Sequence, residues 1–459
     1  NNTANNTANN TANNTANNSH SRCHAVLNRR KPPPPAEALP CSSESNMHQS
    51  TLSALRSLRH RLHANPYAAG SEGFTAAAIY NFLTAHDVEI THTNVNGGFG
   101  MVAKIEGTAP APPNTDTATS TPSSVLLRAD MDALPLLEET PNLPHKSTIS
   151  GFHHACGHDG HSTMLAGALV ELQHQKETFH GTIHGLFQPA EETGQGAKQM
   201  LDATAPAIPR PNKGCYGLHN IPGHPLGTVL LTPKGVAARA SCGLRFHIQG
   251  HSAHASEPEK GVSPGVVLGQ LVQPNSPLAL LPEQLLRDNH VPPQIAQGKL
   301  LATVVHFQLG EHSDFGILPA NGSINVTCRA DRTEDLRVLK EAVRAVVAQE
   351  SKRGGCELIG MEEIEPFPAT INDARRSAVV EQAALLLNAK VHRMQQPFSW
   401  SEDFAHFGDH CSSGAVLFGL GSGERCPPLH SKTYDFPDEL IERGVELWTN
   451  IGKMGLQSQ

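Results

Sequence analysis

The chain lacks an excess of basic residues, a long apolar run and a regular spacing of cysteines. Its 459 residues carry a formal net charge of −8, so the basic surface of a nucleic-acid-binding protein is not expected. No apolar stretch reaches the about 18 residues that a membrane-spanning helix needs, so no membrane partner is expected. The nine cysteines are scattered, which does not indicate a disulfide framework and favours a reducing, cytoplasmic compartment.

Residues 1–46 lack the pattern of a folded segment. Asn-Asn-Thr-Ala occurs four times over residues 1–16, and four prolines follow at 32–35. Such a polar tract buries too little apolar surface to offset the entropy of ordering it. No acidic residue precedes Glu37, as in an organellar transit peptide. The alternative is a misassigned start, since Met47 is the first methionine.

Hydrophobic periodicity predicts an α/β chain from Met47 onward. Leucines recur at helical spacing over 52–62, which predicts a first helix. Short apolar segments at 125–128 and 182–187 are typical of strands, and the segment between them, 164–172, has a helical pattern. Strands that alternate with helices predict a sheet covered by helices on its faces.

A second unit is predicted at residues 238–365. The order of its expected elements is β-α-β-β-α-β, which is that of a ferredoxin-like unit. The expected strands are 244–248, 302–308, 323–329 and 357–364, and the expected helices are 262–272 and 336–348. A helix at 378–387 and a strand at 415–418 then resume the first pattern. The second unit therefore interrupts a first unit formed by 47–237 and 366–459.

Residues suited to metal chemistry occur in four separate segments. Cys156 and His158 lie two residues apart in a glycine-containing loop that opens a helix, where a thiolate and an imidazole can point at one ion. Glu191 and Glu192 directly follow a strand, so that one carboxylate can bind metal while the other acts as a general base. Single histidines complete the set, His219 in the third segment and His430 in the fourth.

These segments, in this order, resemble the M20 family of metallopeptidases and amidohydrolases. The branch they resemble most contains hippurate hydrolases, N-acyl amino acid amidohydrolases and plant auxin-conjugate hydrolases. The resemblance runs from about Leu52 to Trp448 and rests on the segments RLHANP (61–66), LRADMDALP (127–135), CGHDGH (156–161), QPAEE (188–192), GHSAHAS (250–256), SEDFA (401–405) and LHS (429–431).

The resemblance implies a fold and a set of functional residues. The fold is a zinc-peptidase-like catalytic domain, with a mixed sheet flanked by helices, and an inserted ferredoxin-like α+β domain that serves as lid and dimerisation domain. Glu191 is implied as the base, Asp132 as the residue that orients a ligand, and His254 as a lid histidine that holds the reacting carbonyl oxygen, often from the partner subunit. The implied ligands of two divalent ions are Cys156, His158, Glu192, His219 and His430.

The expected reaction is hydrolysis of the amide bond of an N-acyl amino acid. A dipeptidase or carboxypeptidase of the same fold, and a non-catalytic metal-binding relative, are the alternatives. A mixed set of Cys, His and Glu ligands suits Mn²⁺ or Zn²⁺ better than Mg²⁺ or Ca²⁺.

Three features of the inserted unit bear on substrate binding and on dimerisation. Arg329 matches a family arginine that can hold a substrate carboxylate, and the alternative is a surface arginine at a strand end. Gly316 stands where the family commonly has Asn, which removes an amide side chain near the substrate. The lid helix is interrupted by Pro274, Pro277 and Pro282, so the dimer interface is expected to differ from the usual one.

Removal of residues 1–46 is expected to leave the melting temperature and any turnover unchanged, because nothing in that segment can join a core. The measurement is thermal unfolding of the truncated and the full-length chain. A truncation that continues through Leu58 is the control and should lower the melting temperature. A large loss of stability or activity in the shorter truncation would contradict the prediction.

Overall fold

The computed structural model of the chain describes residues 49–111, 121–201, 208–232, 235–287, 299–311 and 315–458. The segment 1–46, for which no fold was predicted, lies outside the described residues. Within the described ranges, no helix combines the length and the apolar character needed to cross a bilayer.

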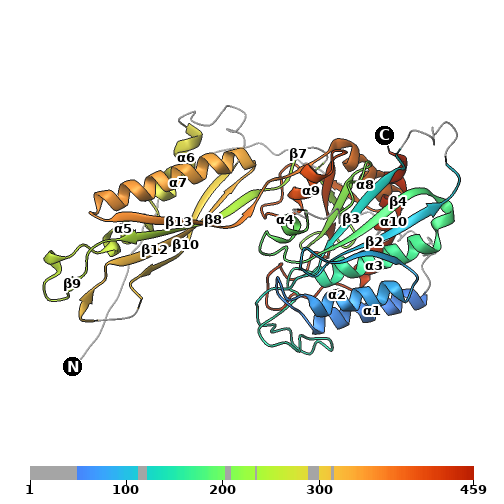
Figure 1. Cartoon of the computed structure of the whole chain (residues 1–459), viewed down its shortest axis with the longest axis horizontal. Helices are drawn as coiled ribbons and strands as arrows, with labels where there is room; N and C mark the ends of the chain where they lie inside the picture. Colours follow the sequence, from blue (N-terminus) through green and yellow to red (C-terminus); the bar gives the residue numbers. More distant parts are fainter. Residues whose placement is uncertain are drawn as a thin grey trace, which may run out of the picture. The chain divides into compact units, whose positions relative to one another are not determined.

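The larger sheet is mixed and has eight strands (Figure 1). The inner strands are parallel: β3 pairs with β4 and β5, and β5 pairs with β16. Since parallel strands end at one edge of a sheet, loops that follow β3, β4 and β5 meet there. In spatial order the strands are β1 (Glu89–Val95), β2 (Gly100–Thr108), β4 (His180–Gln188), β3 (Ser124–Asp130), β5 (Cys215–Ile221), β16 (Ala415–Gly421), β6 (Val229–Leu231) and β15 (Val391–Arg393).

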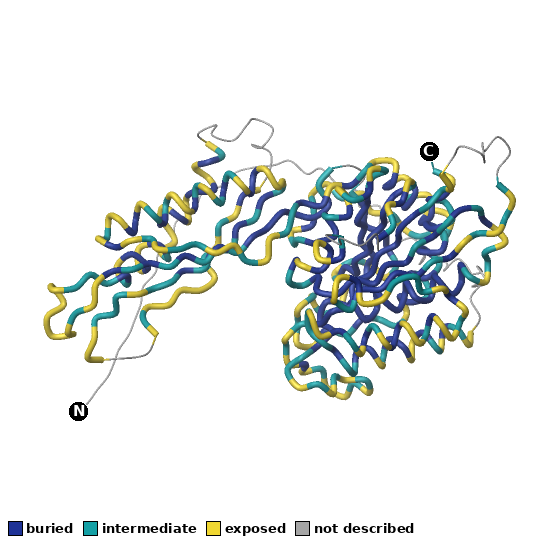
Figure 2. The backbone as a smooth tube through the Cα atoms, in the orientation of Figure 1, coloured by how far each residue is buried: buried dark blue, intermediate teal, exposed yellow. Residues whose placement is uncertain are grey.

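Both faces of this sheet are covered, and its strands are largely buried (Figure 2). Alternate side chains of β3 enter different cores: Leu127 packs on one face and Leu126 on the other, as the two-residue period of a strand requires. The first core includes residues of α1 (Gln49–Ala64), α2 (Gly73–Thr84), α3 (His158–His174), α8 (Ala374–Leu386) and α10 (Glu439–Gln457). The second includes residues of α4 (Gly196–Leu201) and α9 (Ala405–His410).

The smaller sheet has four antiparallel strands with its own core. Its order is β10 (Leu300–Leu309), β12 (Asn321–Ala330), β8 (Ala240–Gln249) and β13 (Glu357–Phe367). Every second residue of β8, from Ala240 to Ile248, is buried. The helices whose residues share this core are α5 (Pro264–Leu271), α6 (Pro277–Arg287) and α7 (Thr333–Arg353).

The chain leaves the large sheet after β6 and returns to it at β15 and β16, so the small sheet interrupts the large one. This confirms the predicted fold class. The two connecting strands, β7 (Gly235–Ala238) and β14 (Thr370–Asn372), pair antiparallel with each other. The domain boundaries at 237/238 and 365/366 stay predictions. The remaining short elements are η1 (Lys176–Thr178), η2 (Pro258–Lys260), β9 (Ala253–His254) and β11 (Ile317–Leu318).

The helix of the inserted unit is interrupted between α5 and α6, where Pro274 lies, as predicted, but Pro282 lies inside α6 rather than at a break. The expected helix 262–272 ends near Leu271, but a further helix, α6, begins at Pro277. Proline suits the first position of a helix because its missing N–H would have no partner there. The hydroxyl of Ser276 accepts a hydrogen bond from the Ala279 N–H at 3.0 Å, which caps this helix.

A disulfide joins Cys215 and Cys411, which the scattered cysteine spacing did not indicate. The two residues are 196 positions apart in the sequence. Cys215 opens β5, and Cys411 lies just before β16, the parallel neighbour of β5. Strand pairing, which the spacing does not encode, therefore brings them together. The other cysteines in the described ranges are free.

Candidate metal centre

The predicted metal ligands meet where β3, β4 and β5 end. Cys156 lies in the loop before α3, and His158 is the first residue of that helix. Gly157 between them has a φ of 91°, and a Cβ there would lie 2.5 Å from Oδ1 of Asn220. Both the left-handed backbone and the close approach require glycine. The loop can therefore turn sharply enough to place the thiol and the imidazole on one side.

The ligand atoms form overlapping groups, each with all its atoms within 4.8 Å of one another. The Sγ of Cys156 lies 3.4 Å from Nε2 of His219. The Nε2 of His430 lies 3.5 Å from Oε1 of Glu192, and Nε2 of His158 lies 4.0 Å from the same oxygen. Three of the groups are Cys156–His158–His219, Cys156–Glu192–His430 and His158–Glu191–Glu192. The structure thus brings all the predicted ligands together.

Neighbouring carbonyls and carboxylates orient the histidines. Nδ1 of His158 bonds to the Asp132 carbonyl at 2.9 Å and lies 3.3 Å from the Asp132 carboxylate, which leaves Nε2 facing the cluster. Nδ1 of His219 bonds to the Asn220 carbonyl at 2.8 Å. The second oxygen of Asp132 accepts the Glu192 N–H at 3.0 Å. Such contacts fix the tautomer and direction of a metal-binding imidazole.

The donor set fits a metal ion because some of its atoms are otherwise unsatisfied. Nε2 of His158 is buried and has no hydrogen-bond partner among the described residues. Oε1 of Glu192 is also buried, and its contact with Nε2 of His430 is long, at 3.5 Å. A buried polar atom without a partner is costly. A cation held by thiolate, imidazole and carboxylate groups would satisfy these atoms.

Glu191 and Glu192 are neighbours in different environments. Burial raises the pKa of Glu191 well above its usual range, and the carboxylates of Glu402 and Glu192 raise it further. Burial acts in the same direction on Glu192, but the hydrogen bond with His430 and the charge of His158 outweigh it and lower the pKa of Glu192. Ala190, just before the pair, has a φ of 53°. This turn sends the two side chains to different surroundings.

Arg128 of β3 joins the loops beneath the cluster. Its guanidinium donates to Oε1 of Gln188 at 2.8 Å, to Oδ2 of Asp130 at 2.6 Å and to Oδ1 of Asp403 at 3.0 Å. The Glu402 carboxylate lies 2.9 Å from the same group. All these side chains are buried. Asp130 in turn bonds to Nδ1 of His161 at 2.7 Å.

Arg128, Asp130 and Asp403 lie in segments that carry the family resemblance, but no role was predicted for them. A charged Arg-x-Asp inside the apolar stretch VLLRAD was the available signal, because charged residues are rarely buried unless they are paired. Trp400 was also missed. Its ring centroid lies 4.9 Å from that of His219, and it stacks on Phe398 at 4.6 Å.

A cavity of about 490 Å³ opens onto the cluster. Arg329, predicted to bind substrate, lines it and donates to the Ser401 hydroxyl at 3.0 Å. His254, predicted to hold the carbonyl oxygen, is not in its lining. The His254 side chain is exposed on β9 and bonds to the Ser256 hydroxyl at 2.7 Å. Within one chain, therefore, the structure places Arg329 at the site and His254 away from it.

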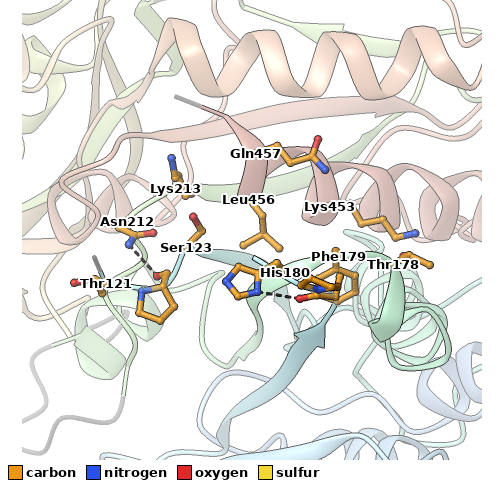
Figure 3. Close-up of a pocket in the computed structure, with 13 residues that line it drawn as sticks. Thr121, Ser123, Thr178, Phe179, His180, Asn212, Lys213, Lys453, Leu456 and Gln457 are labelled. Carbon is orange, nitrogen blue, oxygen red and sulfur yellow. Dashed lines mark hydrogen bonds between the residues drawn. The ribbon is translucent and has the colours of Figure 1, made fainter. Parts of the chain in front are cut away.

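A larger cavity lies elsewhere. It measures about 990 Å³ and is lined by residues such as Phe179, His180 and Lys453 (Figure 3). None of the predicted ligands lines it. Cavity volume alone would therefore not identify the cavity beside the candidate metal ligands.

Comparisons with known proteins agree with this geometry. Residues 126–453 match the family described as Peptidase family M20/M25/M40. The chain is 30% identical to IAA-amino acid hydrolase ILR1-like 5 of Arabidopsis thaliana over 405 residues, which cover 86% of this chain and 85% of that protein. It is 29% identical to ILR1-like 4 of the same organism over 401 residues, covering 86% and 84%.

The fold is similar to a solved structure from Bacillus subtilis, the YXEP protein, which is described as a dinuclear metal binding peptidase from the M20 family. The TM-score is 0.69 at 22% identity, with 90% of this chain and 100% of that chain covered.

Replacing Arg128 by Leu is expected to destabilise the chain by about 3–5 kcal/mol, because it leaves buried carboxylates without their cation. Chemical denaturation measures the change. Arg353→Leu is the matched control, since that side chain is 74% exposed at the end of α7, and it should change stability little. If the two substitutions change the free energy of unfolding equally, the buried contacts of Arg128 do not stabilise the fold more than those of an exposed arginine.

Proposed function

Because the chain belongs to peptidase family M20/M25/M40, whose members hydrolyse amide bonds, we propose that it is a two-metal amidohydrolase of N-acyl amino acids or similar amino-acid conjugates. The observation that carries this proposal is the convergence of candidate ligands around Glu191, beside a cavity that Arg329 also lines. These ligands are Cys156, His158, Glu192, His219 and His430. The names of the Arabidopsis relatives, which are IAA-amino acid hydrolases, support a conjugate as substrate.

Two divalent ions, Mn²⁺ or Zn²⁺, would be held by these ligands. The donor chemistry supports this choice, because thiolate and imidazole ligands disfavour Mg²⁺ and Ca²⁺. When bound, such ions acidify a water molecule and polarise the amide carbonyl. Asp132 contributes indirectly, since it holds both the His158 ring and the Glu192 backbone in position.

Glu191 handles the proton. Its carboxylate accepts the proton of the attacking water and later returns it to the leaving nitrogen of the amino acid. The environment of Glu191 suits this part, because it is buried among other carboxylates and its carboxyl group is not held by Arg128. Closure of the cavity around the substrate would exclude bulk water and strengthen these interactions.

Arg329 binds the carboxylate of the amino-acid part of the substrate. Arg329 lines the cavity and donates a hydrogen bond to Ser401. A guanidinium has five N–H groups, so it can also donate to a substrate. A bidentate contact with a carboxylate would set the direction in which the substrate lies. Ser241 and Ser401 line the same cavity.

His254 acts from a second copy of the chain. Its side chain is exposed and lies outside the cavity of its own chain. The segment that pairs with it, Ile317–Leu318, is partly exposed, and Phe315 beside it is 95% exposed. An apolar exposed segment beside an unused histidine supports a homodimer in which the inserted domain carries His254 to the partner's cavity.

The expected reaction is tested with the metal-loaded chain and a panel of N-acetyl, N-benzoyl and indole-acetyl amino acids beside dipeptides. On the preferred substrate, Glu191→Gln should retain both metals yet lose kcat by about 10²–10⁴-fold, the usual contribution of a general base. Glu192→Gln should lose metal affinity and, as a consequence, activity. Elemental analysis and single-turnover rates measure the two effects side by side.

The opposite pattern, with a metal-depleted Glu191→Gln and a metal-replete but inactive Glu192→Gln, would reverse the two roles. Full activity of both variants, or of protein freed of metal by chelation, would remove the basis of the hydrolase proposal at this site.

Replacing His254 by Ala should lower kcat by about 10²-fold, the scale for loss of one oxyanion donor, with bound metal unchanged. His251→Ala is the control, since His251 is also exposed and lies three positions earlier. A mixture of His254→Ala and Glu191→Gln chains should regain part of the activity if the histidine acts across a dimer. Equal losses for His251→Ala and His254→Ala would argue against a specific role.

A further inference from the structure

Glu365 occupies an unusual backbone position at the end of β13. Its φ is 49°, in the left-handed region that residues other than glycine rarely adopt. The pairing of β13 with β8 shifts register between Ile364 and Phe367, so Glu365 lies in a β-bulge. Bulges are frequent beside active sites, where they redirect a side chain. Strain of this kind persists where the surrounding structure holds it and is common at binding sites.

The bulge places Glu365 in the lining of the cavity that contains the metal cluster. The other carboxylates of this lining are already engaged. Glu191 and Glu192 belong to the cluster, and Glu402 lies 2.9 Å from Arg128. Glu365 is exposed to the solvent, and within the described part of the chain its carboxylate has no hydrogen-bond or ion-pair partner. It therefore remains available to a ligand.

Arg329 and Glu365 line one cavity without pairing with each other. Arg329 donates to Ser401 instead. Burial lowers the pKa of Arg329, and the charge of Arg239 lowers it further, so its main charged neighbour is another cation. The cavity thus offers a guanidinium and a separate carboxylate. A ligand with both a negative and a positive group would match this arrangement.

We propose that Glu365 is a specificity-determining residue that binds an ammonium or guanidinium group of the substrate. The proposal rests on the proposed function and narrows it to positively charged conjugates. The cationic group has two sources: the side chain of an N-acylated lysine, ornithine or arginine, or the free α-ammonium of a dipeptide. In both, Arg329 takes the carboxylate and Glu365 takes the cation, while the amide bond lies at the cluster.

The experiment compares matched substrates with the metal-loaded enzyme. Nα-acetyl-lysine and Nα-acetyl-norleucine differ in a side-chain ammonium, and glycyl-leucine and acetyl-leucine differ in an α-ammonium. Glu365→Gln removes the charge and keeps the shape of the side chain. The control is Glu357→Gln, which changes an exposed glutamate at the opposite end of the same strand. Equal melting temperatures of the two variants establish that the fold is retained.

For wild-type enzyme and the control, kcat/KM should favour the charged member of one pair. In Glu365→Gln this preference should fall by roughly 5-fold, mostly through KM, which is the scale of a solvent-accessible ion pair. High salt screens an exposed ion pair, so it should also reduce the preference of the wild-type enzyme for the charged substrate. A loss confined to the lysine pair assigns the side-chain ammonium, and a loss confined to the glycyl-leucine pair assigns the α-ammonium.

If Glu365→Gln is active and its preference is unchanged in both pairs, the assignment of Glu365 is overturned while the proposed function stands. Absence of hydrolysis of every substrate by metal-loaded wild-type protein overturns the proposed function, and this assignment with it. A fall of the same size in the Glu357→Gln control would show a general effect of surface charge and would also overturn the assignment.

Discussion

The buried guanidinium of Arg128 is the interaction on which the rest of the site depends. It joins Asp130 at the end of β3, Gln188 at the end of β4 and the loop that carries Glu402 and Asp403, which is 275 positions away from Arg128 in the sequence. One cation among several buried carboxylates is stable only with this dense pairing. Asp130 also lies 3.8 Å from Nε2 of His158, so this network borders the candidate metal ligands directly.

The cluster shows how a folded chain holds atoms in an arrangement that suits an ion. Asp132 and the Asn220 carbonyl turn the His158 and His219 rings so that Nε2 faces inward. Burying the unpaired Nε2 of His158 and the Glu192 oxygen costs free energy, which the packing of α3 against the sheet offsets. Because the ligands are already oriented in the folded chain, the free energy of ordering them is lost during folding. Little rearrangement is then needed when ions and substrate bind.

The proposed catalytic residues and the proposed recognition residues come from different parts of the chain. The large sheet supplies the proposed ligands and base, whereas Arg329 and Glu365 come from strands of the small sheet, β12 and β13. Both cavity residues lie close to the connecting strands, where the backbone of the inserted unit meets the cavity. In this arrangement, the recognition residues can change without disturbing the contacts of Arg128 or the metal ligands.

The sequence by itself predicted the fold class and a candidate set of metal ligands, because both depend on local segments and on the family resemblance that these segments carry. Apolar alternation predicted the buried face of β8, and the short spacing of Cys156 and His158 predicted a metal site. Only the tertiary structure decided which distant residues meet. The partners of Arg128, the Cys215–Cys411 bond, the absence of His254 from its own chain's cavity and the position of Glu365 depend on strand pairing and on one bulge. Such contacts join segments far apart in the chain, and neither spacing nor periodicity encodes them.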